Sequence, residues 1–393
     1  MRRPRLVYVV THPVTADVLL RGQLTFMRER GFEVSVVSAP GPELDRVRER
    51  EGVETVVVPM VRNNDAKADV VSLARMVRVL ERLRPDIVNA GTPKGGLLGM
   101  IAARTLSVPV RIYLLRGLRL ETVHGVLRPI LAATERIAST CAHDVACVSP
   151  SLRDISVAGG YISKRKATII GAGSSNGVDT TRFQRTPELR AEGTRLLESL
   201  GVPSDAPLVG FVGRLVADKG IAELLDAFAI VKREVPAARL VLLGGDLGDE
   251  VADASLVAKV RAAEGVVATP KIRDLAPYYA RIDVLGFPSF REGFPNVVME
   301  AASAEVPVVG FRSTGVVDGI VDGETGAIVD QRDVAGLARG ITRYLKDPKL
   351  AAAHGRTARA RTERLFRHEV VWNAWFEAYE ARLRARGLPL PKS

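Results

Sequence analysis

Residues 281–301 read RIDVLGFPSFREGFPNVVMEA, and this stretch indicates both a fold class and a candidate site. The apolar run DVLGFP is typical of a strand buried in a parallel sheet, and the turn after it leads into the helical pattern NVVMEA. Pro295 suits the first turn of a helix, because its ring fixes φ and it has no N–H to satisfy. We therefore expect a strand, a short loop and a helix that begins near Pro295.

Two carboxylates, Glu292 and Glu300, flank the Gly-Phe-Pro-Asn turn of this stretch. The unpaired N–H groups at the start of a helix favour an anion such as a diphosphate. Glu292 is then placed to accept hydrogen bonds from sugar hydroxyls, and Glu300 from a ribose diol. The turn residues expected to contact this ligand are Gly293, Phe294, Pro295, Asn296 and Val297. A surface helix with two glutamates is the alternative, and the motif alone does not exclude it.

A second motif, LVGFVGRLVADKG at 208–220, runs from an apolar strand through a Gly213-Arg214 turn to the start of a helix. Arg214 and Lys219 are five positions apart across the loop, which lets them hold one diphosphate from two sides. Charge-assisted hydrogen bonds to phosphate are strong. A solvated pair of cations ahead of a helix is the alternative, and the presence of both motifs in one chain disfavours it.

Strands and helices alternate along the whole chain, a pattern typical of parallel sheets with helices on both faces. The length of 393 residues predicts two domains, because a single core rarely grows that large. Expected strands of the first domain are 6–10, 33–38, 53–58, 86–90, 109–115 and 144–149, with helices at 18–30, 68–83, 95–105 and 125–139. Expected strands of the second domain are 208–213, 239–245, 266–270, 283–288 and 306–311. The Gly-, Ser- and Asn-rich segment 171–183 is the predicted hinge.

These motifs carry a resemblance to a known family. FVGRLVADKG (211–220), LLGGD (242–246), the stretch 281–301 and TGVVDGIVDGETGAIV (314–329) resemble the C-terminal half of retaining glycosyltransferases of family 4, which have the GT-B fold. The segments 86–122, 147–154 and 174–183 are similar to its bacterial polysaccharide and glycan-assembly branch, which adds sugars to lipid-diphosphate carriers. The resemblance covers about residues 5–380.

The resemblance implies an α/β fold of two facing Rossmann-like, doubly wound parallel-sheet domains. It places an acceptor-binding domain at 1–175, a nucleotide-sugar-binding domain at 176–365, and a crossover helix at 366–393 that packs on the first domain. Ligands would bind where the carboxyl ends of the strands meet. Lys271 and Ile272 would seat the nucleobase. The apolar stripe of the last helices, 348–385, is interpreted as packing and not as a cofactor-binding surface.

The resemblance also implies a retaining reaction without metal or cofactor. Arg214, Lys219 and the helix dipole ahead of Val297 would stabilise the departing diphosphate, which itself accepts the proton of the acceptor. We assign Arg214, Lys219 and Glu292 as catalytic residues on this basis.

Three positions of the first domain depart from the family pattern or stay ambiguous. Where many members have a Gly-Gly loop, this chain has Thr-His-Pro-Val-Thr, so His12 is either an acceptor-site residue or a plain surface histidine. Where much of the family has a histidine, this chain has Arg116, which cannot serve as a general base. Arg116 therefore either donates hydrogen bonds to a phosphate or an anionic acceptor, or pairs with Glu121. Lys94, in TPKGG, is either a phosphate ligand or part of a helix-start loop.

Charge is uneven along the chain: residues 1–180 hold 26 Lys and Arg against 17 Asp and Glu, and the remainder 30 against 28. A basic first domain favours contact with anionic lipid headgroups, although plentiful arginine explains it equally simply. Nucleic acid is disfavoured because the basic residues lack aromatic stacking partners. Cys141 and Cys147 lie in or beside apolar runs, so we expect buried thiols in a reducing compartment, with neither a disulfide nor a metal site.

Several expected sequence patterns do not occur, and this argues against two classes of enzyme and against a membrane-spanning or secreted protein. No GxGxxG follows the first strand and no GxxxxGK[ST] occurs, which argues against a nicotinamide-dependent oxidoreductase and a P-loop enzyme. No apolar run is long enough to span a bilayer and no signal peptide is complete, so a cytoplasmic protein, peripheral at the inner face of the plasma membrane, is expected.

The function predicted from the sequence is therefore a hexosyl- or N-acetylhexosaminyltransferase. It would use a nucleoside-diphosphate sugar, by preference a UDP-sugar, and a lipid-diphosphate-linked saccharide as acceptor. The alternatives are a small-molecule acceptor, such as a natural-product aglycone or a sugar phosphate, and a non-catalytic homologue that binds sugar nucleotides.

Overall fold

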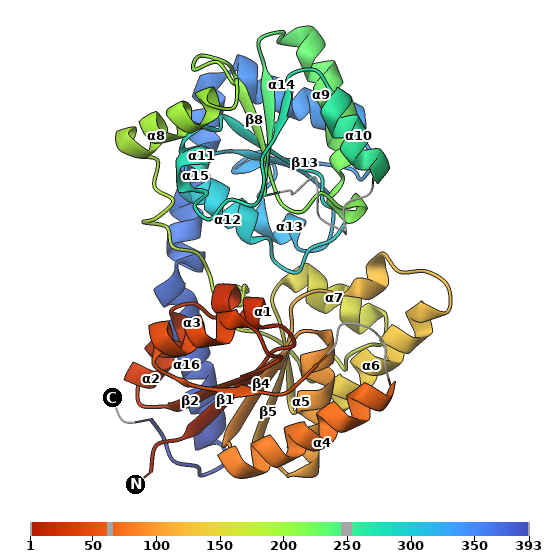
Figure 1. Ribbon diagram of the computed structural model, residues 1–393, viewed down its shortest axis with the longest axis vertical. Helices are drawn as coiled ribbons and strands as arrows, with labels where there is room; N and C mark the ends of the chain where they lie inside the picture. Colours follow the sequence, from red (N-terminus) through yellow and green to blue (C-terminus); the bar gives the residue numbers. More distant parts are fainter. Residues whose placement is uncertain (1, 61–65, 245–253, 392–393) are drawn as a thin grey trace. The chain divides into compact units, whose positions relative to one another are not determined.

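The computed structural model of the chain describes residues 2–60, 66–244 and 254–391. It consists of two compact units, one formed by Met1–Gly177 with His368–Ser393 and the other by Val178–Arg367. In each unit a parallel sheet lies between layers of helices (Figure 1). The predicted pair of doubly wound parallel-sheet domains is confirmed.

The first unit is built on a seven-stranded sheet of order β3-β2-β1-β4-β5-β6-β7, in which all the described pairs are parallel. Its strands are β1 (Arg5–Val9), β2 (Glu33–Ser38), β3 (Glu54–Val57), β4 (Ile87–Gly91), β5 (Val110–Leu115), β6 (Asp144–Cys147) and β7 (Ala167–Ile169). The central strands are apolar on both faces because helices cover both, as the Val- and Ile-rich runs predict.

The helices of this unit are α1 (Pro13–Leu19), α2 (Gln23–Glu29), α3 (Pro42–Glu51), α4 (Ala66–Leu83), α5 (Pro93–Thr105), the short 3₁₀ helix η1 (Arg119–Glu121), α6 (Leu127–Cys141), α7 (Pro150–Ala158) and α16 (His368–Arg384). The prediction of one helix at 18–30 is wrong. The chain breaks at Gly22, which has φ +74 and lies so close to Trp372 that a Cβ there would come within 2.5 Å of the ring.

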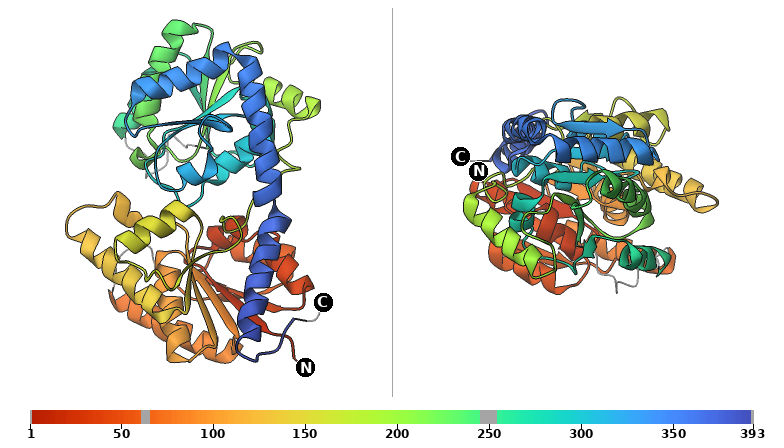
Figure 2. Two further views of the ribbon diagram at one scale, coloured as in Figure 1. Left: turned by 180° about the vertical axis from the view of Figure 1, so that it is seen from behind. Right: turned by 90° about the horizontal axis from the view of Figure 1, so that it is seen from above.

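The last helix, α16, packs against the first unit, although the second unit precedes it in the chain (Figure 2). Trp375, Tyr379 and Leu383 are buried along it. The Tyr379 hydroxyl accepts a hydrogen bond from Asn89 at 2.6 Å and donates one to the Tyr8 hydroxyl at 3.3 Å. Burial of such large side chains stabilises this docking by roughly 1.5–3 kcal/mol each.

The second unit is built on a six-stranded sheet of order β10-β9-β8-β11-β12-β13, again parallel throughout the described pairs. Its strands are β8 (Leu208–Val212), β9 (Arg239–Leu243), β10 (Val266–Ala268), β11 (Val284–Phe287), β12 (Val308–Phe311) and β13 (Gly326–Val329). Its helices are α8 (Pro187–Glu198), η2 (Ala217–Lys219), α9 (Ile221–Glu234), α10 (Ala254–Ala262), α11 (Ala276–Arg281), α12 (Asn296–Ser303), α13 (Val316–Gly319), α14 (Val334–Lys346) and α15 (Pro348–Phe366).

Two edge strands, β7 and β13, were not predicted. Each has only three or four residues and is largely half-buried, so neither shows the apolar run that marks the central strands. Cys141 and Cys147 are buried, as predicted, and both are free thiols in the structure. Burial raises the pKa of the Cys147 thiol to about 12, which keeps it protonated.

Candidate functional site

The loop after β8 is held against the loop after β11 in the second unit. Gly220 has φ +69, and a Cβ at this position would lie 2.1 Å from the carbonyl oxygen of Pro288. The backbone N–H of Phe290 donates to the carbonyl of Asp218 at 3.0 Å. Only glycine permits both this conformation and this approach, so Gly220 brings the two predicted motifs together.

Two ion pairs join these loops. Lys219 Nζ contacts Glu292 Oε1, and Arg291 Nη2 contacts Asp218 Oδ2 at 2.7 Å. The four side chains are all partly buried, which strengthens the pairs relative to solvated ones. Lys219 and Glu292 are 73 positions apart in the chain and were predicted separately; the structure brings them into direct contact.

Arg214 differs from Lys219 in its surroundings. It follows Gly213 directly after β8, its residue is exposed, and its guanidinium has no hydrogen-bond or ion-pair partner within the described part of the chain. The backbone N–H of Gly213 donates to Leu243 at 3.0 Å, which continues the β8–β9 pairing to the carboxyl edge of the sheet. Arg214 is thus free to bind an anion at that edge.

The Gly-Phe-Pro-Asn turn forms the start of α12. Pro295 is the N-cap residue, one position earlier than its predicted place in the first turn, and the helix proper begins at Asn296. The backbone N–H of Glu292 donates to Thr314 at 2.9 Å, and the Phe294 ring packs on Phe366 at 4.7 Å between centroids. The turn is fixed on both sides, and the first N–H groups of α12, including that of Val297, have no partners within the helix.

Glu300 lies one turn further along α12 in a partly buried position. Its Oε2 accepts a hydrogen bond from the Tyr279 hydroxyl at 2.9 Å. Burial raises the pKa of the Glu300 carboxyl, and the hydrogen bond from Tyr279 opposes that rise. Tyr279 was not predicted, because nothing in the sequence links a tyrosine of α11 to a glutamate 21 positions away.

The predicted nucleobase residues follow β10 at the same sheet. Lys271 is exposed and Ile272 is half-buried, three and four positions beyond the end of the strand. Both lie on the carboxyl side of β10, as the prediction requires. Of the motif at 242–246, Gly245 and Asp246 lie outside the described residues.

In the first unit, hydrogen bonds join the loop after β1 to the loop after β4. Thr11 Oγ1 lies 2.7 Å from Thr92 Oγ1 and accepts from the N–H of Gly95 at 2.8 Å. Thr92 has φ +72, a strained value for a β-branched residue. His12, half-exposed, is the N-cap residue of α1, and the Lys94 ammonium pairs with Asp69 of α4 at 2.8 Å.

Arg116, directly after β5, carries buried guanidinium nitrogens that lack partners. Its Nε and Nη1 are shielded from solvent and donate to no hydrogen-bond acceptor among the described residues. These two nitrogens donate no hydrogen bond to Glu121, and Nη1 lies beside Gly91, where a Cβ would be 2.8 Å from it. Burial lowers the pKa of Arg116 to about 10, so it is charged at neutral pH.

Each unit thus presents cationic side chains where its parallel strands end. Ligands of open α/β sheets bind at this carboxyl edge, and buried unpaired cations there favour anionic ligands. The described residues include no group of three or more His, Cys, Asp or Glu placed to hold a metal ion. Fold and site together define a two-domain α/β protein with the features of an enzyme that handles phosphorylated substrates.

Comparisons with known proteins give the family. The model described as "Glycosyl transferases group 1" matches residues 194–361, and the "Glycosyl transferase 4-like domain" matches residues 18–173. The capsular polysaccharide biosynthesis glycosyltransferase CapM of Staphylococcus aureus is 35% identical over 386 residues, which is 98% of this chain and 99% of that protein. The chain therefore belongs to the group 1 glycosyltransferases of family 4, as the motifs predict.

Solved structures share the GT-B fold. Sucrose-phosphate synthase from Thermosynechococcus elongatus superposes with a TM-score of 0.82 at 19% identity, covering 98% of this chain and 100% of that one. Anabaena Alr3699/HepE, in complex with UDP and glucose, superposes with a TM-score of 0.79 at 19% identity, covering 96% and 100%.

Proposed function

We propose that this glycosyltransferase moves a hexosyl or N-acetylhexosaminyl group, with retention of configuration and without a metal, from a UDP-sugar to a lipid-diphosphate-linked saccharide. The observation that carries the proposal is the contact between Lys219 and Glu292 beside the start of α12. In this proposal the ammonium of Lys219 binds the diphosphate and the carboxylate of Glu292 binds the sugar, so the second unit is the donor-binding domain.

The reaction follows from this arrangement. The bond between the sugar C1 and the β-phosphate oxygen breaks, and the acceptor oxygen bonds to C1 on the same face. Arg214, Lys219 and the N–H groups of Asn296 and Val297 stabilise the charge that develops on the departing diphosphate. The acceptor's proton passes to that diphosphate, so no side chain has to act as a general base.

The remaining contacts of the donor are assigned to the same edge of the sheet. Glu292 and the backbone at Gly293 and Phe294 bind the sugar, Glu300 binds the ribose diol, and Lys271 with Ile272 flank the base. UDP as the nucleotide is supported by the UDP complex of HepE, and a polysaccharide product by the name of CapM.

The unpartnered guanidinium nitrogens of Arg116 favour an acceptor substrate that carries negative charge. A buried guanidinium without a counter-ion is costly, and a phosphate or diphosphate group of the acceptor would offset that cost. A lipid diphosphate satisfies this requirement, and so does a sugar phosphate, which is the second candidate acceptor. His12 and Lys94, at the same edge of the first unit, are assigned to the acceptor side.

Peripheral contact of a cytoplasmic protein with the inner face of the plasma membrane is supported by α6 and its flank. Val126 is 86% exposed and Ile130 52% exposed, beside the exposed Arg128 and Arg136. No helix within the described ranges is long and apolar enough to cross a membrane. We expect V126D/I130D to sediment less with phosphatidylglycerol vesicles than the wild type, whereas V57D, at a valine of β3 that is as exposed as Ile130, should not.

The function is tested by incubating the protein with UDP-sugars and GDP-sugars, each with a lipid-diphosphate saccharide or a sugar phosphate, in the presence of a chelator. The expected result is transfer to the lipid-linked acceptor with a product whose anomeric configuration, read by NMR, matches the donor. Inversion or a requirement for metal would contradict the mechanism. Nucleotide binding without turnover on either acceptor would favour a non-catalytic homologue.

A further inference from the structure

A second basic site lies in the first unit, at the edge of the sheet opposite Arg116. It is an open cavity of about 600 Å³, a size typical of small-molecule sites. Six cationic side chains line it: Arg104, Arg111, Arg165, Lys166, Arg382 and Arg386. Asp144 is the one carboxylate among its lining residues.

The position in the sheet separates this cavity from the proposed reaction. Arg111 is the second residue of β5, Asp144 is the first residue of β6, and Lys166 directly precedes β7. These are the amino-terminal ends of the strands, whereas Arg116 follows the carboxyl end of β5. Five residues of extended strand separate Arg111 from Arg116, which corresponds to roughly 17 Å.

Part of the positive charge has a structural role. Lys166 Nζ donates to the carbonyls of Ser139, Thr140 and Ala142 at 2.7–3.0 Å, and Arg111 Nε donates to Cys141 at 2.8 Å. These carbonyls belong to the carboxyl end of α6. Cations at such an end are favoured by the helix dipole, so these two residues cap the helix.

The structural role does not account for all the charge. The helices α5, α6 and α16 end at the cavity, and each contributes roughly half a negative charge. With the carboxylate of Asp144, which pairs with Arg382 at 2.9 Å, they offset about two and a half of the six positive charges. An excess of about three to four positive charges is left in one hollow.

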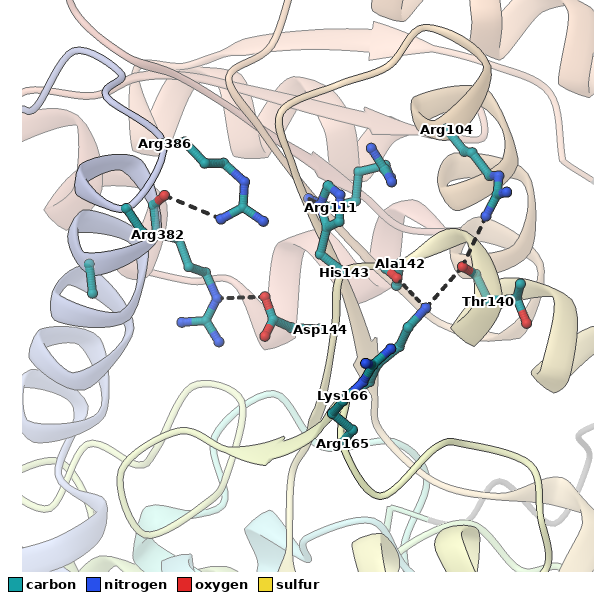
Figure 3. Close-up of a pocket in the computed structure, with 12 residues that line it drawn as sticks. Arg104, Arg111, Thr140, Ala142, His143, Asp144, Arg165, Lys166, Arg382 and Arg386 are labelled. Carbon is teal, nitrogen blue, oxygen red and sulfur yellow. Dashed lines mark hydrogen bonds and ion pairs between the residues drawn. The ribbon is translucent and has the colours of Figure 1, made fainter.

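Two of the remaining arginines, Arg165 and Arg386, are exposed and form no ion pair with a described residue (Figure 3). Arg386 donates only to the carbonyl of Arg382, at 3.4 Å. Burial and then the nearby Arg111 and Arg386 lower the pKa of His143 to about 4, so the histidine stays neutral while the arginines around it stay charged.

We infer that this cavity binds a multiply charged, phosphate-bearing ligand at a site separate from the donor and acceptor sites. Arginine donors in a fork geometry suit phosphate oxygens, and a diphosphate or a cluster of phosphates would neutralise the excess charge. The phosphate can belong to a free phosphorylated molecule or to a lipid headgroup. The inference does not depend on the proposed transferase reaction.

The test uses the full chain carrying R116M/R214A/K219A, so that phosphate binding at the proposed donor and acceptor sites is removed. Inorganic pyrophosphate and inorganic phosphate are titrated by calorimetry, and vesicles of phosphatidylglycerol are tested by co-sedimentation. R165E/R386E changes two cavity arginines that hold no fold contact through an ion pair. R195E/R233E is the matched control, because it makes the same charge change at exposed arginines of the second unit.

We expect saturable pyrophosphate binding that weakens about tenfold or more in R165E/R386E and stays unchanged in R195E/R233E. If the parent binds vesicles but not pyrophosphate, and R165E/R386E loses the vesicle binding, the phosphate belongs to a lipid headgroup. The inference would be overturned if both double variants bound the probes equally well or lost binding equally. It would also be overturned if the parent bound none of the three probes. Unfolding curves of each variant verify that all are folded.

Discussion

Lys219 of the second unit and Arg116 of the first unit are held in different ways. In the second unit, Lys219 is paired with Glu292 and Asp218 with Arg291, so the cation and carboxylate of the proposed donor site are fixed before a ligand binds. In the first unit, two guanidinium nitrogens of Arg116 are buried and have no hydrogen-bond partner among the described residues. Paired charges cost little to keep in place, whereas isolated buried charges persist at the expense of stability.

This difference indicates that Lys219 and Arg116 have different roles in binding. A donor site that always receives the same diphosphate benefits from a preorganised pair, because the transition state is then stabilised without rearrangement. An unpaired cation such as Arg116 obtains its counter-ion only from a bound molecule. Substitution of Arg116 is therefore expected to lower activity and raise stability, whereas substitution of Lys219 should lower both.

The largest effect is expected from Lys219→Ala. Loss of the charge that stabilises the departing diphosphate should lower kcat by roughly a hundredfold or more. The free energy of unfolding should fall as well, because Glu292 is left without its partner in a partly buried position. Steady-state kinetics with the donor and acceptor proposed above checks this, with Lys349→Ala, at an exposed lysine of α15, as the control that keeps full activity.

The second-largest effect is expected on the pH dependence of stability, and it concerns Glu135 of α6. Its Oε2 accepts a hydrogen bond from the Tyr113 hydroxyl at 2.7 Å. Burial raises the pKa of this carboxyl from 4.5 to about 7. The folded state therefore holds the proton more tightly than the unfolded state, and this contribution to stability is present at low pH and lost as the pH rises through 7.

Between pH 5 and pH 7 the loss should be about 2 kcal/mol in the free energy of unfolding. Glu135→Gln keeps the hydrogen-bond acceptor and removes the titration, so its stability should be flatter over this range. Urea unfolding at several pH values measures the difference. A variant with the same pH dependence as the wild type would show that Glu135 does not titrate there.

Arg116→Met tests the unpaired cation directly. We expect kcat/KM for the acceptor to fall about tenfold or more, because the counter-charge for its phosphate is lost. The free energy of unfolding should rise by about 1 kcal/mol, because an uncompensated buried charge disappears. Arg119→Met, at an exposed position nearby, is the control. Lower stability with unchanged acceptor kinetics would make Arg116 a structural residue.

The smallest effect is expected from Tyr279→Phe, which removes the hydrogen bond to Glu300. KM for the donor should rise several-fold, corresponding to about 1 kcal/mol. This hydrogen bond opposes the rise in the pKa of Glu300, so its loss raises that pKa further. The acid limb of kcat/KM for the donor should then move to higher pH, whereas the neighbouring Tyr278→Phe should leave it in place.

Sequence patterns predicted the parallel sheets because both faces of their central strands are buried and leave continuous apolar runs. They missed the short edge strands β7 and β13, and they failed where a long-range contact decides, as when Trp372 approaches Gly22 and the expected helix at 18–30 divides. Both cationic motifs of the second unit were predictable, but the ion pair between them was not, since it joins residues 73 positions apart. That Arg116 has buried, unpartnered nitrogens could be seen only in the structure, because a sequence does not show which nitrogens are buried.

The central claim is that Arg214 and Lys219 bind the diphosphate of the donor while Glu292 faces the sugar. The most direct measurement is a crystal structure of the chain with a nucleoside diphosphate sugar bound. The account predicts diphosphate oxygens within hydrogen-bond distance of both cations and a sugar hydroxyl donating to Glu292. Diphosphate bound elsewhere, or these side chains directed into bulk solvent, would contradict it.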